Sequence, residues 1–102
     1  MGDVITLSEG PLHPKRAMER IKILWREGAV IWTPHAESVM KARHIELTDV
    51  QHIIRYGRVA EHTRGRHRWR YRVEGTSVDG DPAACAVEIN GLLVIVTVFF
   101  IA

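Results

Sequence analysis

The sequence predicts an α+β domain whose N-terminal helices pack on one face of a four-stranded antiparallel sheet. Two observations predict this class. Apolar residues recur at helical spacing in the first half of the chain, whereas from Arg58 onwards they alternate with polar residues, as in strands. Asn90-Gly91 is the preferred dipeptide for a two-residue hairpin loop. The expected order is therefore three helices followed by four strands.

The three expected helices lie between residues 14 and 57. The first spans residues 14–28 and the third spans residues 48–57, with Gly57 as a left-handed cap. The second begins at Pro34, where a missing N–H costs nothing, and Thr33 is its N-cap. Each helix therefore carries its own start or stop signal.

The strands follow from the alternation of apolar and polar residues. In the last hairpin Ile89 is expected to face Leu92, which places Thr97 opposite Ala84. Val30–Trp32 is long enough only for a stub of strand. The four expected strands cover residues 59–63, 66–74, 84–89 and 92–100.

The 102-residue chain is predicted to be one domain over residues 13–102, preceded by a flexible N-terminal arm over residues 1–12. Its single cysteine, Cys85, excludes an internal disulfide and predicts a buried thiol in a reducing compartment. The longest apolar run, residues 92–102, is well short of the roughly 20 residues of a membrane helix. No leader is visible at Met1, so we expect a cytoplasmic protein without a membrane partner.

Charge is segregated along the sequence. Residues 73–102 contain four acidic residues and no lysine or arginine. Residues 58–72 contain six arginines against one acidic residue, Glu61. This pattern indicates one basic face for a polyanion. The arginines expected to hold an RNA backbone, on the strand face opposite Trp69 and Tyr71, are Arg66, Arg68, Arg70 and Arg72.

The second helix carries the residues that suit phosphate chemistry. His35 and Arg43 share a flank of this helix, about 12 Å apart along its axis. The positive end of the helix dipole favours a neutral His35 ring, and the free N–H groups there can hold an anion. Thr97 is expected opposite Ala84, with Ala86 nearby, and these small side chains leave space over its hydroxyl. The hydroxyl then either lines the floor of a substrate site, or Thr97 only fills a strand position by propensity.

One pattern spread over the chain resembles a known family. It resembles small bacterial domains of unknown function grouped with the RelE-like and BrnT-like toxins of type II toxin–antitoxin systems. The resemblance covers roughly residues 30 to 100. The residues that carry it are His35-Ala36, Met40, Arg43, Ile45, Gly57, Glu61, Tyr71, Gly75, Gly80 and Val96-Thr97-Val98-Phe99.

The resemblance implies a RelE-like fold, a metal-independent activity that cleaves RNA, and a neutralising antitoxin encoded nearby. The chain departs from the family at two positions. Val39 stands where family members often carry a basic residue, and His44 stands where they often carry glycine. The first difference removes a phosphate contact, and the second bears on how the helix ends.

Two functional hypotheses remain open. In the first, the protein is a ribonuclease toxin in which His35 acts as base or acid, Arg43 as the cation and Thr97 as a hydrogen-bond donor. Its partners would be RNA, free or on the ribosome, and an antitoxin protein. No cofactor or metal is expected, because no histidine pair has the spacing of a helical zinc site.

In the second hypothesis the domain binds nucleic acid or protein without turnover. His35 would then pack at the helix start, and Arg43 would pair with Glu61 or Asp49. The four arginines would meet RNA or an acidic protein segment. Whether the chain forms a homodimer through its apolar carboxyl end is left open.

Overall fold

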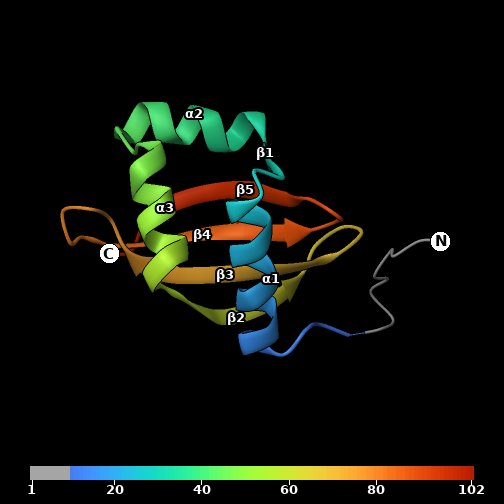
Figure 1. The fold of residues 1–102 in the computed structure, drawn as a ribbon. Coiled ribbons are helices and arrows are strands. Elements are labelled where there is room, and N and C mark those ends of the chain that lie inside the picture. Colours follow the sequence, from blue (N-terminus) through green and yellow to red (C-terminus); the bar gives the residue numbers. More distant parts are fainter. Residues whose placement is uncertain (1–9) are drawn as a thin grey trace.

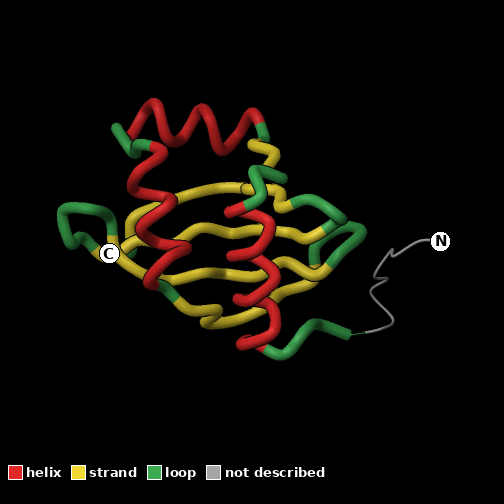
Figure 2. Tube along the Cα trace, in the orientation of Figure 1, coloured by secondary structure: helices red, strands yellow, loops and turns green. Residues whose placement is uncertain are grey.

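The computed structural model describes residues 10–102, which form three helices and five strands (Figures 1 and 2). The helices are α1 (Pro14–Arg26), α2 (Pro34–Arg43) and α3 (Leu47–Tyr56). The strands are β1 (Val30–Trp32), β2 (Arg58–Arg64), β3 (Trp69–Thr76), β4 (Pro82–Ile89) and β5 (Leu93–Phe100). Within this part of the chain, no helix is long and apolar enough to span a bilayer.

Residues 1–9 of the N-terminal arm predicted over residues 1–12 lie outside the described residues. Within the described part, the backbone N–H of Leu12 donates a hydrogen bond to the Tyr71 hydroxyl at 2.8 Å. Leu12 also packs against the hydrophobic core. The chain is therefore attached to the sheet just before α1 begins.

The α+β class is confirmed, but the sheet has five strands and is mixed. Its order is β1-β5-β4-β3-β2, and β1 pairs in parallel with β5. The prediction of a four-stranded antiparallel sheet is wrong at this edge, because Val30–Trp32 is too short to show a strand period. Flanking hydrogen bonds extend the pairing, from Leu93 N–H to the Ala29 carbonyl at 2.8 Å and from Thr33 N–H to the Ile95 carbonyl at 3.1 Å.

The helices α1 and α3 cover one face of the sheet, and α2 runs beside β5, as Figure 1 shows. The core fills the space between these two helices and the sheet. Among its fully buried side chains are Ile21, Val50, Ile53, Val73, Val87, Leu93, Ile95 and Val98. The apolar stripes predicted for the first and third helices therefore face the sheet.

Gly57 is required for packing rather than as a left-handed cap. Its backbone is extended, with φ −85° and ψ −173°, so the predicted cap geometry is wrong. A Cβ at this position would clash with the Ile53 carbonyl oxygen and lie 2.5 Å from that of Glu74. A Cβ at Gly75 would lie 3.2 Å from the Gly57 Cα. These two glycines let the end of α3 approach β3 closely.

The β4–β5 hairpin exists as predicted, but its register differs. Ile89 pairs with Leu93 rather than Leu92, because the loop has three residues and Gly91 adopts a φ of 67°. Farther along β5, a bulge leaves Val96 without a partner on β4. Thr97 consequently lies opposite Ala86 and not Ala84.

Thr33 connects the start of α2 to this bulge. Its Oγ1 accepts a hydrogen bond from the Ala36 N–H at 3.0 Å, which confirms the predicted N-cap ahead of Pro34. The same hydroxyl donates to the Val96 carbonyl at 2.8 Å. One side chain therefore caps the helix and holds it against the irregular part of β5.

Replacing Thr33 should destabilise the fold through both hydrogen bonds. We predict that Thr33→Val lowers the free energy of unfolding by about 1–2 kcal/mol, because the cap and the bond to the bulge are lost together. Thr33→Ser keeps the hydroxyl and should retain most of the stability. Urea denaturation followed by circular dichroism measures both variants. Equal stability of the valine and serine variants would contradict the role given to the hydroxyl.

Cys85 should be unreactive in the native protein. Complete burial raises the pKa of its thiol to about 12, so the reactive thiolate is scarce at neutral pH. We predict that a thiol reagent at pH 8 labels the folded chain slowly and the urea-unfolded chain at the rate of a free cysteine. Equally fast labelling of both forms would contradict the buried position.

Candidate nucleic-acid interface on the open sheet face

The sheet face opposite α1 and α3 is called here the open face. Strand register places alternate residues of the four longer strands on it. They include Arg58, Glu61 and Thr63 on β2, Arg70, Arg72 and Glu74 on β3, Ala84, Ala86 and Glu88 on β4, and Val94, Thr97 and Phe99 on β5. The open face therefore mixes cations, acids, small residues and one aromatic ring.

A pocket of about 260 Å³ lies where α2 meets the open face. Arg43 enters it from the last turn of α2, and Thr97 enters it from β5. The structure thus brings together two of the three predicted catalytic residues. The α2–β5 pocket is lined by Val39, Arg43, Thr97, Val98, Phe99 and Phe100.

A second depression of about 180 Å³ adjoins the first. Phe99 has no predicted role in the sequence analysis above, although its place two residues after Thr97 puts both residues on one strand face. Phe99 lines both hollows, so its side chain is a wall that they share. The second depression is lined by Glu61, Thr63, Arg70, Arg72, Ala86 and Phe99.

Arg70 is an ion-paired residue and not a free cation. Its Nε and one terminal nitrogen donate to the same oxygen of Glu88, at 3.0 and 2.8 Å. Glu88 lies directly opposite Arg70 on the neighbouring strand. Glu88, which is 18 residues away from Arg70 in the sequence, therefore lies beside it in the sheet and compensates its charge.

Arg72 also faces acids on the open face. Its Nε lies 2.7 Å from the Glu74 carboxylate without the alignment of a hydrogen bond, and a terminal nitrogen lies 3.7 Å from Glu61. Its guanidinium sits 5.0 Å from the centre of the Phe99 ring. Arg72 is therefore held over Phe99, the side chain that lines both depressions.

Arg66 and Arg68 lie in the loop between β2 and β3, because β3 begins only at Trp69. The expectation that they continue the strand face of Arg70 and Arg72 is therefore wrong. The Gly65 N–H donates to the Arg68 carbonyl at 2.8 Å and closes the turn. We call this loop, together with the last residue of β2, the hairpin tip, and its arginines are Arg64, Arg66 and Arg68.

His35 is exposed in the first turn of α2. Helical geometry places it on the same flank as Val39 and Arg43, but it does not line the α2–β5 pocket. Arg43 is exposed and forms no ion pair within residues 10–102. Asp49 instead accepts hydrogen bonds from the backbone N–H groups of Glu46 and Val78. The pairing of Arg43 with Asp49 or Glu61 is therefore not observed.

The histidines of the described chain are dispersed. The His13 ring accepts from the Lys15 N–H at the start of α1, and His52 Nδ1 lies 2.8 Å from the Thr76 carbonyl. His62 packs edge-on against Trp69, which also lies under Arg64 in the hairpin tip. Within residues 10–102, no group of three His, Cys, Asp or Glu side chains lies close enough to hold a metal ion.

One family model matches most of the chain. The family described as Domain of unknown function (DUF4258) matches residues 32–100. The chain belongs to the DUF4258 family. No curated protein and no solved structure matches it. The DUF4258 region runs from the end of β1 to the end of β5, so it includes α2, α3 and the whole open face. The helix α1 lies before this region.

The match bears on one part of the expected resemblance. It confirms that the chain contains a domain of unknown function over almost the expected range. The relation of DUF4258 to RelE-like and BrnT-like toxins stays a prediction. His35, Arg43 and Thr97 all fall within the matched region. Their roles are therefore a question about the DUF4258 domain itself.

Proposed function

We propose that this DUF4258 domain is the toxin of a type II toxin–antitoxin system, with a RelE-like fold and a metal-independent endoribonuclease activity. One observation carries the proposal. Arg43 and Thr97, from distant parts of the chain, line one pocket, and Phe99 lines both that pocket and a depression containing Arg72. A cation, a hydroxyl donor and an aromatic ring are thereby available to a sugar–phosphate chain.

The proposed reaction is attack of an RNA 2′-oxygen on the adjacent phosphorus. A new P–O2′ bond forms and the P–O5′ bond breaks, leaving a 2′,3′-cyclic phosphate and a free 5′-hydroxyl. A base takes the 2′-OH proton and an acid supplies a proton to the departing 5′-oxygen. His35 serves as one of these two groups. Glu61, which lines the second depression, is a candidate for the other.

Arg43 and Thr97 would act on the phosphate itself. The guanidinium of Arg43 stabilises the negative charge that grows on the non-bridging oxygens, and it has no competing ion pair within residues 10–102. Thr97 donates its hydroxyl to one of those oxygens. His35 lies on the same flank of α2 and must reach the sugar from beyond the pocket. RNA therefore runs along α2 in this proposal.

RNA held at the pocket would extend across the sheet toward the hairpin tip. Arg66 is exposed there, and neither it nor Arg68 forms an ion pair in the part of the chain described by the structure. Arg70 and Arg72 contribute less net charge because Glu88, Glu74 and Glu61 face them. The four predicted RNA-binding arginines are therefore expected to contribute unequally to RNA affinity.

Two observations favour a second candidate function, a domain that binds RNA or an acidic antitoxin segment without turnover. His35 does not line the pocket that contains Arg43 and Thr97. The open face also compensates Arg70 through a close carboxylate, which reduces electrostatic stabilisation at phosphorus. In either case the partner is recognised through Arg43 of α2 and the arginines of the hairpin tip.

Cleavage should depend on the three predicted catalytic residues. We predict that Arg43→Ala lowers the first-order cleavage rate of a synthetic RNA by about 10²–10³-fold and His35→Ala by about 10²-fold or more. Thr97→Val, which keeps the side-chain shape, should also slow cleavage. Lys41→Ala is the matched control, because Lys41 is exposed on the other side of α2. Products are identified by their 2′,3′-cyclic phosphate ends.

Two results would decide against catalysis. Equal rates for the wild type, Arg43→Ala and His35→Ala would mean that the observed cleavage comes from elsewhere. Intact RNA whose mobility shifts on binding would favour the second candidate function. Growth arrest on expression, relieved by Arg43→Ala but not by Lys41→Ala, would support the toxin.

RNA affinity should follow the free cations. We predict that Arg66→Ala weakens binding of single-stranded RNA and reduces the salt slope of log K by about 0.7, the value for one phosphate contact. Arg70→Ala should have a smaller effect, whereas Glu88→Gln should strengthen binding by releasing Arg70. Fluorescence anisotropy at several salt concentrations measures all three variants. A larger loss from Arg70→Ala than from Arg66→Ala would contradict this order.

A further inference from the structure

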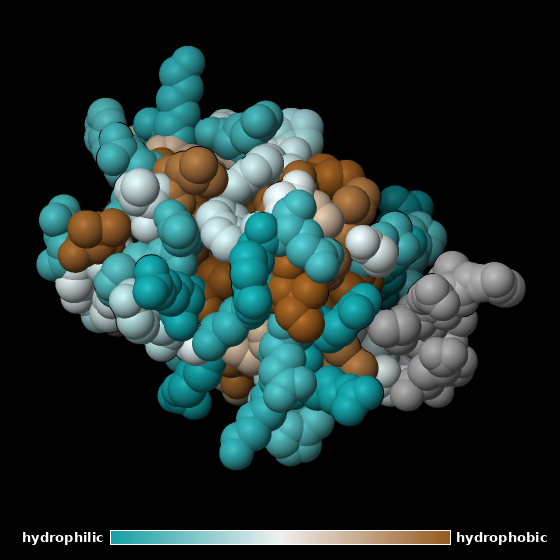
Figure 3. All heavy atoms as spheres, viewed as in Figure 1, coloured by the Kyte–Doolittle hydropathy of each residue, from teal (hydrophilic) through white to brown (hydrophobic). Residues whose placement is uncertain are grey.

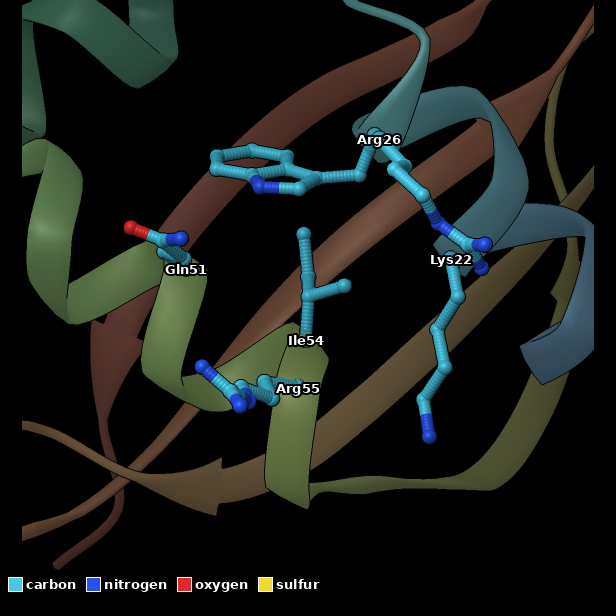
Figure 4. A pocket seen from close by; sticks show the side chains of 6 residues that line it. Lys22, Arg26, Gln51, Ile54 and Arg55 are labelled. Atoms are coloured by element: carbon cyan, nitrogen blue, oxygen red, sulfur yellow. The ribbon is translucent and has the colours of Figure 1, made fainter.

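A groove of about 580 Å³ lies between α1 and α3, on the helix side of the sheet and away from the open face. Figure 3 views this side and shows apolar side chains exposed between polar ones over the helices. Figure 4 shows the groove from close by. It is lined by Lys22, Trp25 and Arg26 of α1 and by Gln51, Ile54 and Arg55 of α3.

The floor of the groove is apolar and firmly held. Ile54 is only 2% exposed, so its side chain is part of the core as well as of the floor. Trp25 is half-buried, and its ring meets that of Trp32 edge to face, with 6.0 Å between centroids. The floor is therefore made of packed side chains, and the part of it open to a ligand is the half-buried Trp25 ring rather than Ile54.

The walls of the groove are polar and carry positive charge. Lys22 and Arg26 lie one helical turn apart on α1, and Gln51 and Arg55 lie one turn apart on α3. In Figure 4 the charged ends of Lys22 and Arg26 lie on one side of Ile54, while Gln51 and Arg55 lie on the other. A ligand in the groove would have cations on both flanks.

No acidic side chain lines the groove, and its three cations form no ion pair within residues 10–102. The open face differs, because glutamates lie within 4 Å of both Arg70 and Arg72. Three uncompensated cations around an apolar floor create a positive potential that favours an anionic partner. Because the floor is apolar, such a partner must also present apolar side chains to it.

We propose that this groove binds an amphipathic, acidic helix of a protein partner. Such a helix turns an apolar stripe with i, i+3 and i+4 spacing toward Trp25 and Ile54. Its acidic flanks then face Lys22 and Arg26 on one side and Arg55 on the other. The proposal does not depend on RNA cleavage, which uses the opposite side of the sheet.

The groove suits a peptide better than an RNA strand. Single-stranded RNA is bound through exposed aromatic faces and a continuous track of cations. Here the Trp25 ring is half-buried against Trp32, and the cations lie on two separate walls. The α1 wall also precedes the matched family region, so this groove combines the DUF4258 domain with an additional helix.

A synthetic helical peptide with leucine on one stripe and glutamate elsewhere tests the proposal on the full chain. We expect it to bind and to shift the tryptophan emission, while the same peptide with lysine in place of glutamate should not bind. Lys22→Glu combined with Arg55→Glu should weaken binding more than about tenfold. Arg20→Glu is the matched control, since Arg20 is exposed on the opposite side of α1.

Several outcomes would overturn the groove assignment. Equal binding of the acidic and basic peptides, or an equal loss with Arg20→Glu, would remove the charge argument. RNA binding lost through Lys22→Glu and Arg55→Glu would instead assign the groove to nucleic acid. Thermal unfolding of each variant excludes misfolding as the cause. RNA cleavage is measured in parallel and should not change, so failure of one proposal is distinguishable from failure of the other.

Discussion

The two hydrogen bonds of the Thr33 hydroxyl fix α2 relative to the sheet. One bond satisfies a free N–H in the first turn of the helix, and the other reaches the carbonyl of Val96 in the β5 bulge. Because β1 pairs only with the first part of β5, α2 lies beside the rest of that strand. The position of Arg43 next to Thr97 follows from this attachment.

Strand register decides how the positive charge is distributed. The arginines of β3 lie beside glutamates of their own and neighbouring strands, so the open face is less basic than the sequence of residues 58–72 indicates. Uncompensated cations lie elsewhere, at the hairpin tip and along the groove between α1 and α3. These two regions share no residues, so the RNA and the protein partner that we propose would not compete for the same side chains.

Features encoded by neighbouring residues could be predicted from the sequence. Thr33-Pro34 marks the start of α2 through an N-cap and a fixed φ, and both signals are local. The alternation of Tyr71 and Val73 with arginines likewise predicted which face of β3 is buried. Helical spacing alone likewise places Arg43 on the flank of His35, but it does not predict the α2–β5 pocket, which His35 does not line.

Features that depend on distant partners could not be predicted in this way. The parallel strand β1 has three residues and is recognisable only through its pairing with β5. The three-residue loop and the bulge at Val96 each shift Thr97 by one position along β4, and no local signal in β5 marks the bulge. The compensation of Arg70 by Glu88 likewise depends on register. The groove has walls on two helices and therefore has no contiguous signature.

The most direct test of where RNA binds is a nuclear magnetic resonance titration. Isotope-labelled protein is mixed with an RNA oligonucleotide whose 2′-hydroxyls are replaced by hydrogen, so that it binds without being cleaved. We expect RNA to bind at the α2–β5 pocket, with the largest amide shifts at Arg43, Thr97 and Phe99 and smaller shifts at the hairpin tip. Shifts confined to α1 and α3, with none at the α2–β5 pocket, would contradict it.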